Sequence, residues 1–333
     1  MIIKNIRLQN FRSHQSYFLD FSKQTTMIIG ENGCGKTSVL EGIFEGCQGK
    51  SFKATDKDIL KRDAEFYKVE MEFFDGEKTS VVFDGKNNKK RFFFQDKKTG
   101  RLPRKNKYPV VLFEPSDLNL IGSSPTRRRD YFDKTLAQVT ERYSNSLSKF
   151  NKALKQRNEL LKEEFLREDA IFSWDVMLAK YGAEIAKMRR ENVREINERL
   201  EEVYRGIAEN EDVVGLEYQT EVEDERQYFE MLNKNFQKDH ILGHTSFGVH
   251  RDDYRFLFNG FDADGTASRG ETRSIMLALK FIEAEILAKK LGKKPLILLD
   301  DVFSELDEKR QKCLVKNFKD NQVIITSVEA VDI

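Results

Sequence analysis

The chain has 333 residues, of which 34% are charged and 39% are hydrophobic, and this length exceeds that of a typical single domain. With 57 Lys and Arg against 56 Asp and Glu, the whole molecule has no net attraction to nucleic acid or membrane, so any basic binding face must be local. The three cysteines form no C-x-x-C pair and no apolar run reaches membrane-spanning length, which argues against a disulfide framework, a zinc site or a membrane span and predicts a soluble cytoplasmic protein.

The N-terminal part of the chain is expected to be α/β. Residues 2–30 indicate two short strands, and the second runs into a glycine-rich loop that is followed by apolar residues at helical spacing. Residues 67–94 alternate in the manner of strands and contain Asp-Gly pairs at 75–76 and 84–85. These pairs predict the hairpin turns of a small antiparallel meander. A basic stretch then precedes an apolar strand at 110–113.

Residues 126–207 have a different character, with no proline, few glycines and dense charge. Apolar side chains recur at helical spacing along two stretches separated by a break at 166–170, which predicts two long helices packed as an antiparallel hairpin. The two stripes consist of Leu147, Phe150, Leu154 and Leu161, and of Trp174, Leu178, Tyr181, Ile185 and Met188. Residues 208–245 are acidic and weakly patterned.

After residue 265 the chain returns to α/β character, with a helix, a strongly apolar strand, another helix and a final strand. The α/β elements therefore bracket the helical segment. We expect an α/β lobe made of residues 1–125 and 246–333, and an inserted helical lobe made of residues 126–245.

The glycine-rich loop matches the phosphate-loop pattern G-x-x-x-x-G-K-[ST] in full, with a strand before it and a helix after it. Its glycines allow backbone N–H groups to surround phosphate oxygens at a helix N-terminus. Lys36 would reach the β- and γ-phosphates, and Thr37 would ligate Mg²⁺. The expected nucleotide-binding residues of this loop are Gly30, Glu31, Asn32, Gly33, Cys34, Gly35, Lys36, Thr37 and Ser38.

A second candidate element is the strand of four aliphatic residues that ends in Asp300 and Asp301. A buried parallel strand brings such carboxylates to the carboxyl edge of a sheet, where nucleotide sites lie. Asp300 would hold Mg²⁺ directly or through water, and Asp301 would polarise the water that attacks the γ-phosphate. The pair could also be a solvated end of a strand.

A third element is the helix start at residues 268–273, which reads Ser-Arg-Gly-Glu-Thr-Arg. A serine and a glycine at a helix start present a hydroxyl and N–H groups where an anion could bind. The same residues also fit a simple capping box, with Ser268 as the N-cap and Glu271 three positions later. Local sequence leaves both interpretations open.

The order of these motifs resembles that of ABC-type ATPases in the branch with SMC-like heads, and within that branch the RecF family of bacterial recombination and gap-repair proteins. The segments that carry the resemblance are LQNFRSH at 8–14, GENGCGKTSVLEGIF at 30–44, GKSFK at 49–53, FEPSDLNLIGSSPTRRRDYFD at 113–133, KALKQRNELLK at 152–162, GVHRDD at 248–253, SRGETRS at 268–274 and LILLDDVFSELD at 296–307. The resemblance implies an α/β fold, a P-loop ABC-type ATPase head with a β-meander and an inserted lobe that is a short antiparallel coiled coil.

The resemblance also implies that two copies of the chain act together. Ser268, Gly270 and Glu271 would form a signature motif that contacts, in trans, ATP held by the phosphate loop of the other copy. Ser304 and Asp307 would lie in the loop that crosses the dimer interface. ATP would join the two copies like a clamp on DNA, and its weak, DNA-stimulated hydrolysis would release them.

The partners implied by the resemblance are DNA, either double-stranded or at single/double-strand junctions, and the proteins RecR and RecO. RecA loading at single-stranded gaps would be the outcome. Three basic clusters could contact DNA phosphates, at 86–91, 97–107 and 127–129. Each could equally be a solvated face, and the last could instead serve a helix start or the nucleotide site.

Several residues depart from the family pattern or are ambiguous. Arg269 and Glu271 stand where glutamines are expected, and Thr326 with Ser327 occupies the place where many ABC ATPases have a histidine. Arg12 could contact the nucleotide or be an ordinary arginine at a strand end. Two further residues are expected to be structural: His250, bonded near Asp252 or Asp253, and Trp174, in the helical hairpin.

Two other classes of protein share part of this pattern. The nucleotide-binding subunit of a membrane transporter has the same motif order, but it does not need the NFRSH start or the basic helical hairpin. A monomeric P-loop phosphotransferase would use residues 268–273 only as a helix cap.

Overall fold

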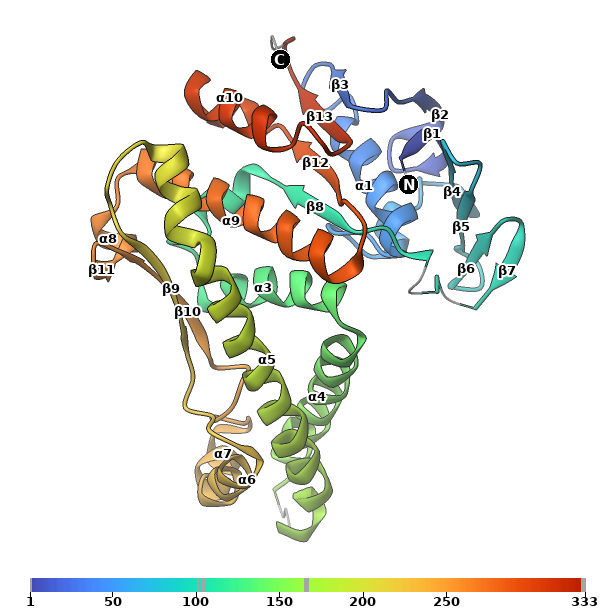
Figure 1. Cartoon of the computed structure of the whole chain (residues 1–333). Helices are drawn as coiled ribbons and strands as arrows, with labels where there is room; N and C mark the ends of the chain where they lie inside the picture. Colours follow the sequence, from blue (N-terminus) through green and yellow to red (C-terminus); the bar gives the residue numbers. More distant parts are fainter. Residues whose placement is uncertain (1, 101, 104–105, 165–167, 331–333) are drawn as a thin grey trace. The chain divides into compact units, whose positions relative to one another are not determined.

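The computed structural model describes residues 2–100, 102–103, 106–164 and 168–330 (Figure 1). Contacts divide the chain into two compact units, one made of Met1–Asp117 with Glu283–Ile333 and the other of Leu118–Ile282. This division differs from the expected boundaries at 125 and 246. Residues 246–282 belong with the helical segment because strand β10 (Asp253–Phe258) pairs antiparallel with β9 (Val214–Gln219) along its whole length.

The first unit contains a four-stranded parallel sheet in the order β3-β13-β12-β8. Its strands are β3 (Thr25–Ile29), β13 (Val323–Ser327), β12 (Leu296–Asp300) and β8 (Val110–Phe113). Every residue of β12 and β13 is buried, as expected for apolar runs in the middle of a parallel sheet. This sheet confirms the second strand predicted within residues 2–30, the strand predicted at 110–113 and the two strands predicted after residue 265.

The same unit contains a six-stranded antiparallel sheet in the order β2-β1-β4-β5-β6-β7. The strands are β1 (Ile3–Phe11), β2 (His14–Asp20), β4 (Phe66–Phe73), β5 (Lys78–Asp84), β6 (Lys89–Phe94) and β7 (Lys97–Thr99). The two Asp-Gly turns do connect β4 to β5 and β5 to β6, so the predicted meander is confirmed. Strand β2 was not predicted, because its alternation of polar and apolar residues is short and only partly buried.

Helix α1 (Lys36–Gln48) contacts strands of both sheets and is buried along almost its whole length. Its apolar residues join those of β1, β4, β12 and β13 in one hydrophobic core. Two glycines make this packing possible, since a Cβ at Gly42 or Gly46 would come within 2.6 Å of Leu8 or 2.5 Å of Met71. The phosphate loop is therefore attached to the most buried helix of the unit. Two short helices complete it, α2 (Asp56–Ile59) and α10 (Glu308–Asn317).

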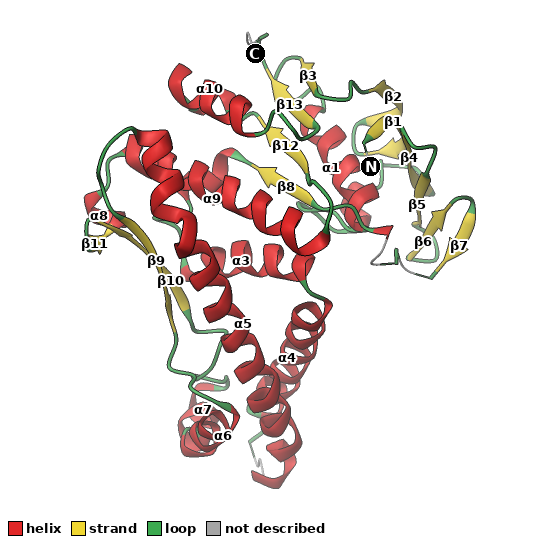
Figure 2. Cartoon of the chain, viewed as in Figure 1, coloured by secondary structure: helices red, strands yellow, loops and turns green. Residues whose placement is uncertain are grey.

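The second unit is mainly helical (Figure 2). Its helices are α3 (Pro125–Val139), α4 (Glu141–Leu160), α5 (Glu168–Ala208), α6 (Glu225–Lys234), α7 (Phe236–Leu242) and α8 (Ala263–Thr266), and α9 (Arg269–Leu291) begins in it. Helices α4 and α5 pack together, which confirms the predicted hairpin, and Trp174 packs against its core. Strands β9, β10 and β11 (Phe261–Asp262) form a small sheet that the acidic segment 208–245 did not predict. Among the described residues no helix is both long and apolar enough to cross a membrane.

Two groups of buried ion pairs join helices of the second unit. Arg157 on α4 donates to Asp175 on α5 at 2.5 Å and to Asp239 on α7 at 2.7 Å. Arg189 on α5 binds both carboxylate oxygens of Asp133 on α3, at 2.9 and 3.1 Å. Removing one member of such a buried pair leaves an uncompensated charge, so these contacts fix the helix register.

His250 is also buried in this unit. Its Nε2 donates to the carbonyl oxygen of Thr245 at 3.0 Å, rather than to Asp252 or Asp253 as the sequence suggested. Its Nδ1 is buried and has no hydrogen-bond partner among the described residues. Burial lowers the pKa of His250 to about 4, so the imidazole is neutral in the folded protein at neutral pH.

This burial predicts a pH dependence of stability. Because the folded-state pKa is below the unfolded value of about 6.5, His250 destabilises the fold as pH falls from about 6.5 to about 4, by up to about 3 kcal/mol. In His250→Gln, which keeps a donor but does not titrate, that part of the loss should disappear while stability at pH 7.5 changes little. Urea unfolding of both proteins across this range measures the difference. Equal pH slopes would show that His250 does not control it.

Candidate nucleotide site

The phosphate loop joins β3 to α1 through backbone that only glycine adopts easily. Gly35 is the N-cap of α1 with φ of 99°, and Gly33 has φ of 84°. A Cβ at Gly35 would also lie 2.6 Å from Nε2 of His14 and 3.0 Å from Oγ of Ser13. Both the conformation and the close approach of the turn between β1 and β2 therefore require glycine at this position.

Lys36 is buried within the curve of this loop. Its Nζ donates to the carbonyl oxygens of Gly30 at 2.7 Å and Glu31 at 3.1 Å. The ammonium group thus lies inside the ring of backbone that begins at Gly30, together with the N–H groups of the first turn of α1. Such an arrangement concentrates positive charge where a phosphate would bind.

Thr37 and the acidic end of β12 lie together. Oγ1 of Thr37 donates to Oδ1 of Asp300 at 2.9 Å, and Oγ1 of Thr326 on the neighbouring strand donates to the same oxygen at 2.9 Å. Burial raises the pKa of Asp300, and the hydrogen bonds from Thr37 and Thr326 oppose that rise. A hydroxyl and a carboxylate oxygen are ligands that suit Mg²⁺, so the residues present fit this ion.

Asp301 follows in an uncommon backbone conformation, with φ of 51°. Its N–H donates to Oγ1 of Thr326 at 3.0 Å. One of its carboxylate oxygens, Oδ1, is buried and has no hydrogen-bond partner among the described residues. Thr326 thus contacts both aspartates: its hydroxyl donates to the carboxylate of Asp300 and accepts from the backbone N–H of Asp301.

A cavity of about 510 Å³ adjoins the phosphate loop. It is lined by Arg12, Ser13, Asn32, Gly33, Gly35, Lys36, Thr37, Ser38, Asp58, Leu60, Lys61, Arg62 and Asp301. The structure therefore brings together most of the predicted site residues of the first unit. Gly30, Glu31 and Cys34 belong to the loop without lining the cavity, and the Cys34 thiol is exposed.

Arg12 lines this cavity, but its guanidinium is held by protein groups. Its Nε and Nη2 donate to the two carboxylate oxygens of the buried Glu41, at 2.8 and 2.9 Å, and Nη1 donates to the carbonyl of Asp58 at 3.1 Å. The hydrogen bond to Glu41 raises the pKa of Arg12. Arg12 is thus a fixed positive charge at the cavity wall, and it joins the end of β1 to α1 and α2.

Ser268, Gly270 and Glu271 belong to the second unit. The backbone N–H of Ser268 donates to Oε2 of Glu271 at 2.6 Å, and Oγ of Ser268 accepts from the N–H of Glu271 at 3.3 Å. The capping box that the sequence suggested is therefore present at the start of α9. The capping box fixes the position of the Ser268 hydroxyl. It also leaves the exposed start of the helix able to contact an anion.

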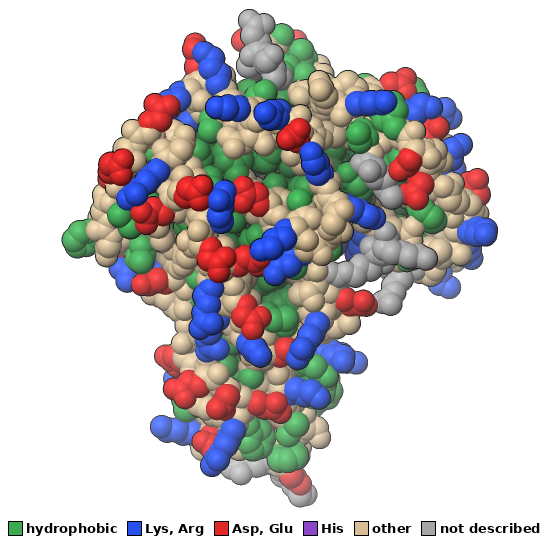
Figure 3. All heavy atoms as spheres, in the orientation of Figure 1, with side chains coloured by type: hydrophobic (Ala, Val, Ile, Leu, Met, Phe, Trp, Pro, Cys, Tyr) green, Lys and Arg blue, Asp and Glu red, His purple; other side chains and the backbone are tan. Residues whose placement is uncertain are grey.

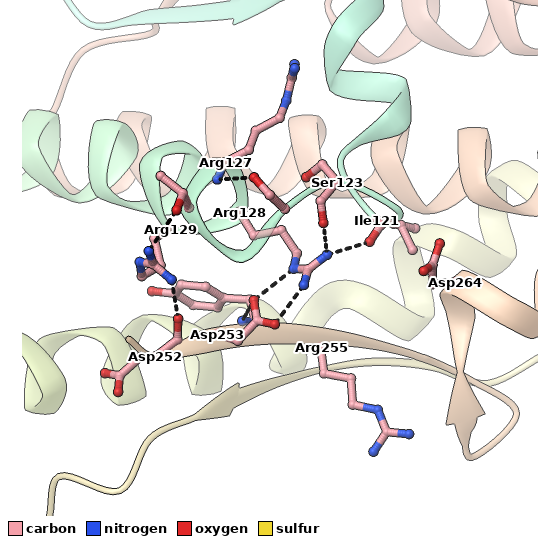
Figure 4. A network of polar contacts seen from close by, with 12 residues as sticks. Ile121, Ser123, Arg127, Arg128, Arg129, Asp252, Asp253, Arg255 and Asp264 are labelled. Carbon is pink, nitrogen blue, oxygen red and sulfur yellow. Dashed lines mark hydrogen bonds and ion pairs between the residues drawn. The ribbon is translucent and has the colours of Figure 1, made fainter. Parts of the chain in front are cut away.

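Most of the third basic cluster is used inside the second unit (Figure 4). Arg128 donates to both carboxylate oxygens of Asp253, at 2.9 and 2.7 Å, and to the carbonyls of Ile121 and Ser123. Arg129 donates to the carbonyl of Asp252 at 2.6 Å. Arg128 and Arg129 are therefore structural, and of the three only Arg127 is exposed, with its side chain directed away from the network.

The other two clusters differ along their length. Lys90 points inward and binds Glu45 at 2.6 Å as well as Asp56, whereas Lys86 and Lys89 are exposed. In the cluster at 97–107, Lys97 and Lys98 are exposed, while residues 101 and 104–105 lie outside the described residues. The visible face in Figure 3 shows Lys and Arg interspersed with Asp and Glu, in agreement with the balanced composition.

Sequence reasoning missed several residues of the site. Glu41, Asp58 and Lys61 surround Arg12 or the cavity, but each is an ordinary charged residue in its local sequence. Thr326 was noted only as a replacement for histidine. Its place at the end of the last strand, beside the strand that ends in two aspartates, was the one available signal.

Comparisons with known proteins agree with this geometry. Residues 2–332 match the family model described as RecF/RecN/SMC N terminal domain. The chain is 36% identical to the DNA replication and repair protein RecF of Agathobacter rectalis, over 98% of this chain and 92% of the relative. It is 32% identical to the protein of the same name from Clostridium acetobutylicum, over 100% and 94%.

Solved structures give the same result. The recombination mediator protein RecF with ATP, in the RecFOR pathway, is similar with a TM-score of 0.88 and 30% identity, covering 100% of this chain and 93% of that one. A second RecF structure of the pathway, named RecF-ATPrS, has a TM-score of 0.89 and 31% identity over 99% and 93%. These similarities do not support a transporter subunit or a phosphotransferase. The chain belongs to the RecF family of DNA replication and repair proteins.

Proposed function

We propose that this chain is an ATPase that binds DNA in recombinational and replication-gap repair, and that ATP makes two copies dimerise. The observation that carries the proposal is the group formed by Lys36, Thr37, Asp300 and Asp301 beside a cavity of about 510 Å³. This group combines a phosphate cradle with carboxylates at the carboxyl edge of a parallel sheet. The related RecF structure solved with ATP supports ATP as the nucleotide.

Each residue of the group has a proposed role. The N–H groups of the phosphate loop and Lys36 would bind the phosphates, and Thr37 with Asp300 would hold Mg²⁺, which supplies positive charge against the β- and γ-phosphates. Asp301 would orient and polarise the attacking water, since one of its buried oxygens has no hydrogen-bond partner among the described residues. The remaining proposed nucleotide contacts in the same chain are Gly30, Glu31, Asn32, Gly33, Cys34, Gly35, Ser38 and Arg12.

The second half of each site would come from the other copy. Ser268 and Gly270 stand at an exposed start of α9, where the hydroxyl and the helix dipole suit a γ-phosphate. Glu271 would take part in trans as well, with its carboxylate tied to the N–H of Ser268. ATP would then stabilise the dimer because it binds the dimer more tightly than the monomer.

Ser268→Arg tests the composite site. The larger cationic side chain should block the partner's phosphate, so ATP should still bind the monomer with a dissociation constant within about threefold of the wild-type value, but ATP-driven dimers should disappear. Light scattering and equilibrium nucleotide binding measure the two effects. Asp300→Asn is the contrasting variant, because loss of a Mg²⁺ ligand should weaken ATP binding itself in a Mg²⁺-dependent manner. If Ser268→Arg still forms normal ATP-driven dimers, Ser268 acts only as the cap of α9 and does not contact the partner's nucleotide.

DNA and two proteins are the proposed partners. Exposed Lys86, Lys89, Lys97 and Lys98 on and beside β6 and β7 remain available for phosphate contacts. The pathway named for the related structures suggests RecR and RecO as protein partners, with RecA loading on single-stranded gaps as the outcome. A protein that acts on bacterial DNA in this way would work in the cytoplasm, and DNA would stimulate its weak hydrolysis of ATP.

Replacing Lys86 and Lys89 together by Gln should weaken DNA binding and lower the slope of log affinity against log salt by about two, since each lysine neutralises one phosphate. Binding of gapped and double-stranded DNA at several salt concentrations, with ATP, measures both quantities. The matched control replaces the exposed Lys234 and Lys238 of the second unit by Gln. If both double variants lose affinity equally, the β5–β6 turn is not a specific contact; absence of DNA binding by the wild type at low salt would contradict the proposed function.

A further inference from the structure

His14 lies directly against the phosphate loop. It is the first residue of β2, directly after the turn from β1, and its Nε2 is 3.2 Å from the carbonyl oxygen of Gly35. Since a carbonyl oxygen can only accept, Nε2 carries the proton and donates. The ring also packs against Tyr17, with 4.8 Å between ring centroids. His14 does not line the cavity, so any effect on a bound nucleotide must pass through Gly35.

The carbonyl that His14 binds belongs to a peptide group of the phosphate cradle. It is the N-cap carbonyl of α1, and it also accepts from the N–H of Val39 at 3.2 Å. A trans peptide is planar, so its C=O and N–H point in opposite directions. Fixing the Gly35 carbonyl therefore fixes the N–H of Lys36, which is one of the first N–H groups of the helix and points out of its N-terminus.

The turn that immediately precedes His14 is itself firmly attached. Arg12, two residues earlier, is bound by both oxygens of Glu41 on α1 and by the carbonyl of Asp58. On the other side, the space that a Cβ of Gly35 would need is occupied by His14 and Ser13. Residues 12–14 thus contact α1 at its N-cap and at its second turn. Because its backbone is fixed in this way, His14 can hold the phosphate loop in one orientation.

We propose that His14 is a positioning residue of the nucleotide site, which orients the Gly35–Lys36 peptide so that its N–H faces the phosphate. The proposal rests on the nucleotide site proposed above. Glycine at position 35 gives this peptide unusual freedom, because its φ of 99° lies in a region where glycine has several nearby conformations. A second donor to its carbonyl removes that freedom before the nucleotide binds, and such preorganisation increases affinity.

The test compares three replacements of His14 in the full chain. His14→Phe and His14→Leu remove the donor, and they should weaken binding of ATP and ADP about five- to tenfold, as expected for one lost hydrogen bond. His14→Gln places an amide donor near the position of Nε2 and should restore affinity to within about twofold of the wild type. Equilibrium binding with Mg²⁺ gives the dissociation constants, and thermal melting without nucleotide confirms that each variant is folded.

His240 supplies the matched control. Its Nε2 also contacts a backbone carbonyl, that of Glu163 at 2.9 Å, and its ring also stacks on an aromatic ring, that of Phe236, but it lies in the second unit. His240→Phe should leave the dissociation constants unchanged. Wild-type affinity in His14→Phe and His14→Leu, or equal losses in His14→Gln, would overturn the role of His14. Lys36→Ala separates this result from failure of the site itself, because unchanged affinity there would contradict the nucleotide site.

Discussion

The hydrogen bond between Thr37 and Asp300 joins the phosphate loop to the acidic end of β12. These residues are 263 positions apart in the chain, yet Oγ1 of Thr37 and Oδ1 of Asp300 are separated by 2.9 Å. The contact exists because β3, which leads into the phosphate loop, and β12, which ends in Asp300, lie in one parallel sheet with β13 between them. The carboxyl ends of the strands then meet at one edge, and the loop and the acidic pair are brought together there.

The charges at this edge are arranged in opposition. Lys36 and the first N–H groups of α1 provide positive potential around the loop, while Asp300 and Asp301 stand at the carboxyl end of β12. Burial opposes ionisation of Asp300, and the hydroxyls of Thr37 and Thr326 partly restore it. A site of this kind is completed by a ligand that carries negative phosphate together with a divalent cation. This physical balance, rather than any single motif, supports our proposal that Mg²⁺ and a nucleoside triphosphate bind here.

The parts of the molecule that could be predicted from sequence are those specified by local pattern. The phosphate loop, the Asp-Gly turns and the helical hairpin each depend on neighbouring residues, and each was found where expected. Local pattern could not predict which charged side chains form ion pairs inside the protein and which stay exposed. Lys90 and Arg128 look like members of basic clusters, but long-range partners at Glu45 and Asp253 bury their charge.

The same limit explains the domain boundary and the surroundings of Arg12. The pairing of β9 with β10 joins segments that the chain separates by two helices, so composition alone did not indicate that these segments belong together. Glu41 contacts Arg12 because α1 packs beneath β1, which is a property of the folded core. Local sequence can name a chemical motif, whereas its supporting residues are set by tertiary packing.

The proposed composite site needs Lys36 from one copy and Ser268 from another. Mixing equal amounts of Lys36→Ala and Ser268→Arg chains tests it most directly, because a mixed dimer has one intact site although each variant alone has none. We expect each variant alone to lack ATP hydrolysis and the mixture to recover at most about half of the wild-type rate, since only mixed dimers have an intact site and each carries one of two sites. A mixture as inactive as its components, or full hydrolysis by Ser268→Arg alone, would contradict a site composed from two copies.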